Sequence, residues 1–185
     1  MKVRLFAALL IAAAPVVARA ADEENPYKKV KVGEFATYKM TTKIAGMTLD
    51  GIATQTVTAK DDKEATLKMV VKANGAELPA QEQKIDLTKP YDPTKAGLPP
   101  GSDVKVEKLK EGKEKIKAGG KEYDCKWETF KVAGKTMGVE MSAEVKVWQS
   151  KDLPLQMVKM EMNAEAGGQK FEMEMVLTET GSKSD

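Results

Sequence analysis

Alternation of apolar and polar residues with a period of two restricts the fold of this chain more than any other feature. Neighbouring residues of a β-strand point to opposite faces of the sheet, so such alternation predicts half-buried strands. The pattern is clearest near the end of the chain, where two Met-Glu-Met segments flank Gly167-Gly168. A two-residue hairpin turn at these glycines would place four thioethers on one apolar face. The opposed pairs would be Val158 with Leu177, Met160 with Met175, Met162 with Met173 and Ala164 with Phe171.

Two earlier turns repeat the pattern. Ala45-Gly46 and Asn74-Gly75 each stand between alternating segments, and Asn-Gly is a strong signal for a two-residue hairpin turn. Both turns place the apolar residues of their hairpins on a single face. The opposed pairs would be Tyr38 with Ala53, Met40 with Gly51 and Thr42 with Leu49 in the first hairpin, and Met69 with Ala80 and Val71 with Leu78 in the second.

The second half of the chain also alternates. We expect strands over residues 104–110, 113–118 and 122–132, with a turn at Gly119-Gly120. A loop around Gly134 would return the chain and set Trp127 opposite Met141. Trp148 then breaks the alternation and Pro154 follows it, so we expect a bulge or corner before the methionine hairpin.

About ten strands and no convincing long helix predict an all-β fold, or a β fold with minor α structure. A sheet of this size must curl to bury its apolar face, so we expect a strongly curved antiparallel meander that forms a half barrel or open barrel. Prolines and glycines in residues 89–102 predict a long loop. Residues 21–179 would form one domain, and the polar residues 180–185 would form a flexible tail.

Residues 1–20 resemble a cleaved signal peptide. Lys2 and Arg4 precede an apolar run, and Ala18-Arg19-Ala20 has the small-x-small pattern of a cleavage site. The run is shorter than the ~20 residues that cross a bilayer, and no Cys follows it for lipid attachment. We therefore expect an exported, periplasmic protein without a transmembrane segment after cleavage.

The charge and residue content exclude several functions. Without residues 1–20 the chain has 27 basic residues (30 minus 3) against 28 acidic ones, so it lacks the basic surface that nucleic acid requires. The chain contains no His, which removes the usual general base and the His-dependent nucleophile systems. We therefore expect a protein that is not an enzyme and needs no cofactor.

The methionines admit three interpretations. They can pack a core, they can line an adaptable site for an acyl chain or another hydrophobic ligand, or they can bind Cu(I) through soft thioethers. The predicted function is non-enzymatic binding of a lipid, acyl chain or other hydrophobic ligand on the concave face of the sheet. The alternative from another class is a structural or interaction domain with a fully packed core. The residues predicted to line a ligand are Met40, Leu49, Met69, Val71, Trp127, Met141, Met160, Met162, Met173 and Met175.

Three segments of the chain resemble exported bacterial proteins related to the LolA/LolB lipoprotein carriers. These segments are residues 31–38 (KVGEFATY), 120–126 (GKEYDCK) and 147–159 (VWQSKDLPLQMVK). The resemblance implies an unclosed, curved antiparallel sheet whose concave face takes the acyl chains of a lipoprotein. The carriers also have lid helices and a functional Arg, whereas this sequence shows no long helix and has no Arg after residue 20. We therefore carry over no individual binding residue.

Overall fold

The structure is a computed structural model that describes residues 25–89, 103–136 and 139–183. Within these residues one sheet of ten strands accounts for nearly all regular structure, and a short 3-10 helix, η2 (Pro26–Lys29), precedes it. The predicted all-β fold is confirmed. The predicted signal peptide and nearly all of the predicted proline-rich loop lie outside the described residues. The strands are β1 (Glu34–Ile44), β2 (Met47–Lys60), β3 (Glu64–Ala73), β4 (Ala76–Glu77), β5 (Gln81–Asp86), β6 (Asp103–Ala118), β7 (Lys121–Thr136), β8 (Val139–Gln149), β9 (Met157–Ala166) and β10 (Gln169–Ser182).

The first and last strands lie side by side in the middle of the sheet. The order is β4-β3-β2-β1-β10-β9-β8-β7-β6, and β5 pairs with the outer edge of β3 next to β4. Every pairing is antiparallel, and no pairing joins β4 or β5 to β6 among the described strands. The sheet is therefore open, and it consists of two meanders that are joined through the β1–β10 pair.

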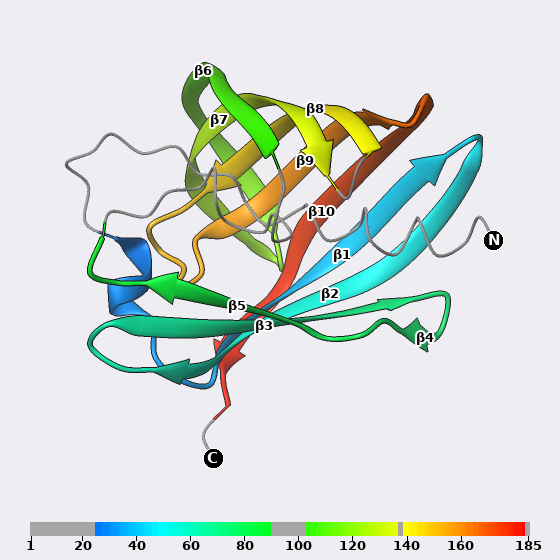
Figure 1. Ribbon diagram of the computed structural model, residues 1–185. Helices are drawn as coiled ribbons and strands as arrows, with labels where there is room; N and C mark the ends of the chain where they lie inside the picture. Colours follow the sequence, from blue (N-terminus) through cyan, green and yellow to red (C-terminus); the bar gives the residue numbers. More distant parts are fainter. Residues whose placement is uncertain (1–24, 90–102, 137–138, 184–185) are drawn as a thin grey trace.

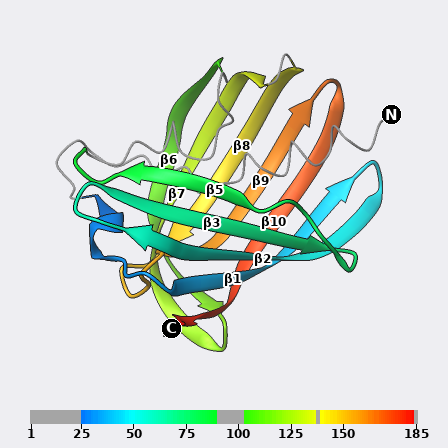
Figure 2. The ribbon, with the colours of Figure 1, turned by 60° about the horizontal axis from the view of Figure 1, so that its bottom comes forward.

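The two halves of the sheet fold across one another. Figure 1 shows β3 and β5 running beneath the strongly curved strands β6–β10, and Figure 2 shows the same strands crossing in front of them. One hydrophobic cluster contains residues from both halves, including Leu67 of β3, Ile85 of β5 and Val145 of β8. The concave face of the half barrel is thus an interior that the first half of the sheet covers.

The predicted methionine hairpin is confirmed. Met162 pairs with Met173 and Met160 with Met175. The turn residues Gly167 and Gly168 both have positive φ, +57° and +78°, as a tight hairpin turn between twisted strands requires. The β1–β2 pairing across Ala45-Gly46 is also confirmed as predicted.

Two predicted details of strands are wrong. Met69 pairs with Gln81 rather than Ala80, because residues 78–80, which include Pro79, leave the strand between β4 and β5. Residues 103–118 form one strand rather than two, because a bulge between Lys108 and Lys110 absorbs the irregularity.

The chain end is also more ordered than its sequence indicates. We expected a flexible tail from Thr180, but β10 continues to Ser182 and the Lys183 N–H donates to Gly33 O at 2.9 Å. The residues are polar, yet their backbone groups find partners in the start of β1, where Glu34 pairs with Ser182.

The predicted register between β7 and β8 is wrong, and the error has consequences for the site. Gly134 lies within β7 and pairs with Met141, while Trp127 pairs with Trp148. The partner of Trp127 has therefore moved by seven positions, from Met141 to Trp148. Because this number is odd, Trp127 lies on the opposite face of the sheet from Met141.

The predicted corner after Trp148 is present. A register shift lies between Trp148 and Gln149, and the chain turns through Ser150 to Gln156, which has a positive φ of 58°.

Next to this corner, Tyr38 is fully buried and its hydroxyl donates to Met157 O at 3.4 Å. Burial raises the pKa of Tyr38 far above its usual value, so this hydroxyl stays protonated.

Candidate functional site

Six methionines from four neighbouring strands form one part of the concave face. We call Met40, Met141, Met160, Met162, Met173 and Met175 the methionine face; their exposed fractions lie between 0% and 7%. The strands β1, β10, β9 and β8 lie side by side, and their registers align residues in rows that run across them. One such row is Met40–Met175–Met160–Val147. Five of the methionines occupy two neighbouring rows, whereas Met141 lies two rows further along the same face of β8, beyond Ala143. The protein's own residues cover all six.

The other four predicted lining residues differ from the methionine face. Leu49, Met69 and Val71 are only partly buried; Val71 packs against the core cluster, whereas Leu49 and Met69 do not belong to it. Trp127 is also partly buried and packs against the core cluster, but its place in the β7–β8 register puts it on the opposite face of the sheet from Met141. Whether any of the ten residues touches a ligand stays a prediction.

A single polar side chain interrupts the methionine face. Thr42 pairs with Met173 on one side and with Leu49 on the other, and it is 3% exposed. Its hydroxyl oxygen is buried and has no hydrogen-bond partner among the described residues. Leaving a buried hydroxyl unpaired costs about 1–3 kcal/mol. The alternation predicts the inward position of Thr42, which it shares with Met40, but the missing partner could be found only in the structure.

Toward β6 and β7 the concave face becomes charged. The rows continue from Val145 to Phe130 and Lys108, and from Val147 to Glu128 and Glu111. We call Lys108, Glu111, Lys126 and Glu128 the charged cluster. The sequence pattern does not predict the charged cluster, because the β7–β8 register expected from Gly134 places Trp127 rather than Glu128 on the concave face.

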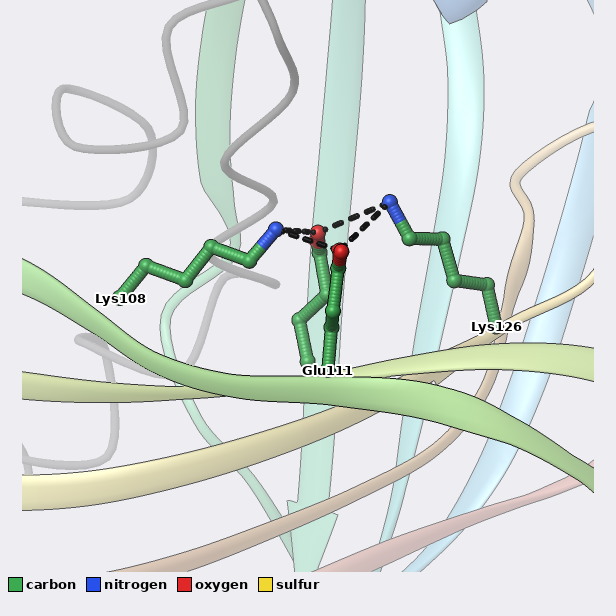
Figure 3. Close-up of polar contacts among 4 residues, drawn as sticks. Lys108, Glu111 and Lys126 are labelled. Carbon is green, nitrogen blue, oxygen red and sulfur yellow. Dashed lines mark hydrogen bonds and ion pairs between the residues drawn. The ribbon is translucent and has the colours of Figure 1, made fainter.

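Each lysine of the charged cluster bridges both carboxylates. Lys108 Nζ lies 2.7 Å from Glu111 Oε2 and 2.6 Å from Glu128 Oε1. Lys126 Nζ lies 3.1 Å and 3.2 Å from the same two oxygens. Figure 3 shows the two lysines reaching in from opposite sides of Glu111. The Glu128 side chain is only 4% exposed, so these ion pairs compensate the charge of a buried carboxylate.

The contacts within the charged cluster shift the pKa values of Glu111, Lys108 and Lys126. Hydrogen bonds from Lys108 and then Lys126 lower the pKa of Glu111 to about 2. Partial burial acts to lower the pKa of both lysines, but the hydrogen bonds to the two carboxylates outweigh it and raise both values. All three groups therefore stay charged near neutral pH, and none of them is suited to proton transfer there.

A pocket of about 740 Å³ lies beside the charged cluster, between β6, β7 and the corner after Trp148. Four lysines and four carboxylates line it, together with Cys125. Burial raises the pKa of the Cys125 thiol to about 11, so it stays protonated and is not a nucleophile near neutral pH. The balanced charges give the pocket no preference for an anion or a cation.

On the opposite face, Lys146 lies between two indole rings. Its Nζ is 4.4 Å from the ring centre of Trp127 and 4.3 Å from that of Trp148. Trp148 Nε1 donates to Glu114 Oε2 at 2.8 Å. Trp148 is 4% exposed and Trp127 packs against the hydrophobic core cluster, so the protein's own side chains fill this aromatic site, and these contacts stabilise the β7–β8 pair.

The described residues contain neither a candidate metal cluster nor a candidate membrane-spanning helix. No group of three or more His, Cys, Asp or Glu side chains within them could hold a metal ion. Across the same residues, no helix has the length and apolar character needed to cross a membrane.

Comparisons with known proteins show a likeness of fold. No family model and no curated protein matches the chain. The chain is similar to the solved structure of a Bacteroides fragilis protein that is described as exported and as having a YmcC-like fold, with a TM-score of 0.52 and 10% sequence identity. The match covers 82% of this chain and 97% of that protein. At this identity only the fold is shared, and the resemblance to the LolA/LolB carriers is not confirmed.

Proposed function

We propose that this protein is an exported, non-enzymatic binding protein that holds the acyl chain of a lipid or lipoprotein against the methionine face. The observation that carries the proposal is the gathering of six buried methionines from four adjacent strands. Methionine is unbranched and polarizable, so it adapts to irregular partners and is over-used on promiscuous binding surfaces. An ordinary core of this size would be specified better by Leu, Ile and Val.

The open sheet provides a physical route for a ligand. No hydrogen-bonded pairing joins β5 to β6 in the described part of the chain, so the two halves can part without breaking a strand ladder. Parting exposes the methionine face, and a hydrophobic ligand then replaces the side-chain contacts that were lost. The cost of opening is therefore offset by burial of the ligand's apolar surface.

The test is native mass spectrometry of protein purified from its own cells, followed by removal of lipid and titration with a fluorescently labelled monoacylglycerol. We expect bound lipid in the first measurement and saturable uptake in the second. Recovery without lipid, together with no uptake, would contradict the proposal.

A pair of variants locates the ligand. Replacing Met160, Met162, Met173 and Met175 together by Leu keeps the face apolar but makes it stiffer, so we expect weaker uptake with the fold retained. Met47→Leu is the control, because Met47 is 61% exposed at the tip of the β1–β2 hairpin.

One observation favours a second function from another class. The methionine face is at most 7% exposed, as expected of a structural or interaction domain with a closed core. The two proposals predict different results in the uptake experiment.

Cu(I) binding by the methionine pairs is a third hypothesis. Its test is a Cu(I) titration under reducing conditions. Weak binding that is unchanged when Met160 and Met162 are both replaced by Leu would contradict it.

A further inference from the structure

We propose that the Thr42 hydroxyl anchors the uncharged carbonyl group of the bound acyl chain, an inference that rests on the proposed function. Thr42 is 3% exposed, and within the described part of the chain its Oγ1 has no hydrogen-bond partner. Buried polar atoms are nearly always paired, and an exception calls for an explanation such as a missing ligand. A ligand carbonyl that accepts from this hydroxyl would supply the missing bond.

The position of Thr42 fits a ligand that enters from the rim of the sheet, at the β1–β2 hairpin turn. Thr42 lies two residues before Ile44, where β1 ends at its hairpin turn, and Ile44 and Leu49 are partly exposed. In the other direction along β1, Met40 and Tyr38 are buried. A carbonyl at Thr42 would leave the outer part of the ligand at the rim, while its hydrocarbon chain runs inward over the methionine face.

The surroundings of Thr42 favour a neutral group over a carboxylate. Its cross-strand partners are Leu49 and Met173, and its neighbours on the same face of β1 are Met40 and Ile44. None of these side chains carries a charge. An ionised carboxylate would be buried there without a cation, which is far more costly than burying a hydrogen-bonded carbonyl. The ligand class is therefore an esterified or amide-linked acyl chain rather than a free fatty acid.

The experiment compares 1-monolauroylglycerol with 1-O-dodecylglycerol, which has the same headgroup and chain length but no carbonyl. Binding of each lipid to the full chain without its signal peptide is measured by calorimetry, with dodecanoate as a third ligand. We expect the wild type to prefer the ester over the ether about tenfold, which corresponds to about 1.4 kcal/mol, and to bind dodecanoate more weakly than the ester.

Two variants test the role of the hydroxyl. Thr42→Val removes it at nearly constant shape and should abolish the preference for the ester, whereas Thr42→Ser should keep it. Thr42→Val is expected to fold, because it removes an unpaired polar group from an apolar face; thermal unfolding verifies this.

Each unfavourable outcome has a separate meaning. Equal binding of ester and ether by the wild type, or an unchanged preference in Thr42→Val, overturns the assignment of Thr42 and leaves the proposed function standing. Tighter binding of dodecanoate than of the ester overturns the neutral ligand class. If none of the three lipids binds, both the proposed function and this inference are wrong.

Discussion

Truncation of Met160 tests whether the methionine face is packed in the free protein. Met160 is fully buried, and its neighbours across the strands are Met175 and Val147. Met160→Ala should leave a cavity, and buried Met→Ala changes cost about 2–5 kcal/mol. For a domain of this size 1 kcal/mol corresponds to about 2–4 °C, so Tm should fall by about 4–20 °C.

The assay is urea and thermal unfolding of lipid-free protein, followed by circular dichroism. Met47→Ala is the matched control; at 61% exposure this truncation should change the free energy of unfolding by no more than about 0.5 kcal/mol. Met160→Leu should cost less than about 1.5 kcal/mol, because it nearly conserves volume. If Met160→Ala lowered the free energy of unfolding by less than about 1 kcal/mol, Met160 would not be closely packed in the free protein, and the reasoning would be refuted.

Three further predictions concern β6 and β7. Glu128→Gln should lower the free energy of unfolding, measured with denaturant, by about 1–3 kcal/mol, because it weakens hydrogen bonds to a side chain that is 4% exposed. Glu140→Gln is the control and should be nearly neutral, because that carboxylate is 84% exposed. Because the pKa of Glu111 is lower in the folded protein, its ionised carboxylate stabilises the fold above the ordinary pKa of 4.5, and this contribution is lost as pH falls toward about 2. The difference in stability between wild type and Glu111→Gln should therefore shrink as pH falls across that range. A difference that stays constant would contradict this prediction. Gly112→Ala would place a Cβ 2.6 Å from Trp127 Cζ2, so it should destabilise the protein and change its tryptophan fluorescence; unaltered emission would show that the ring does not cover this glycine.

The local parts of the fold could be predicted where a turn has a clear signal. Gly167-Gly168 and Ala45-Gly46 connect strands through two residues, so the turn fixes the register and every opposed pair follows. The β7–β8 connection has no such signal. The sequence favours Gly134 as its centre, but this glycine belongs to β7, and the resulting odd shift in register places Trp127 on the other face.

The site could be predicted in part for the same reason. The methionine rows follow from alternation within neighbouring hairpins. The charged cluster does not, because Glu128 meets Lys108 only through the correct β6–β7 pairing with its bulge. The unpaired state of Thr42 depends on every atom around its hydroxyl, and no sequence pattern reports it.

The sequence by itself determined that this protein is a strand-rich chain with one apolar face, because side-chain alternation and the backbone preferences of turn residues act over a few positions. Only the tertiary structure decided that β1 pairs with β10, and that β3 and β5 cover the concave face. These contacts join residues that are far apart in the chain, so they depend on how the whole sheet twists and curls. Burial of the methionine face and isolation of the Thr42 hydroxyl are consequences of that folding.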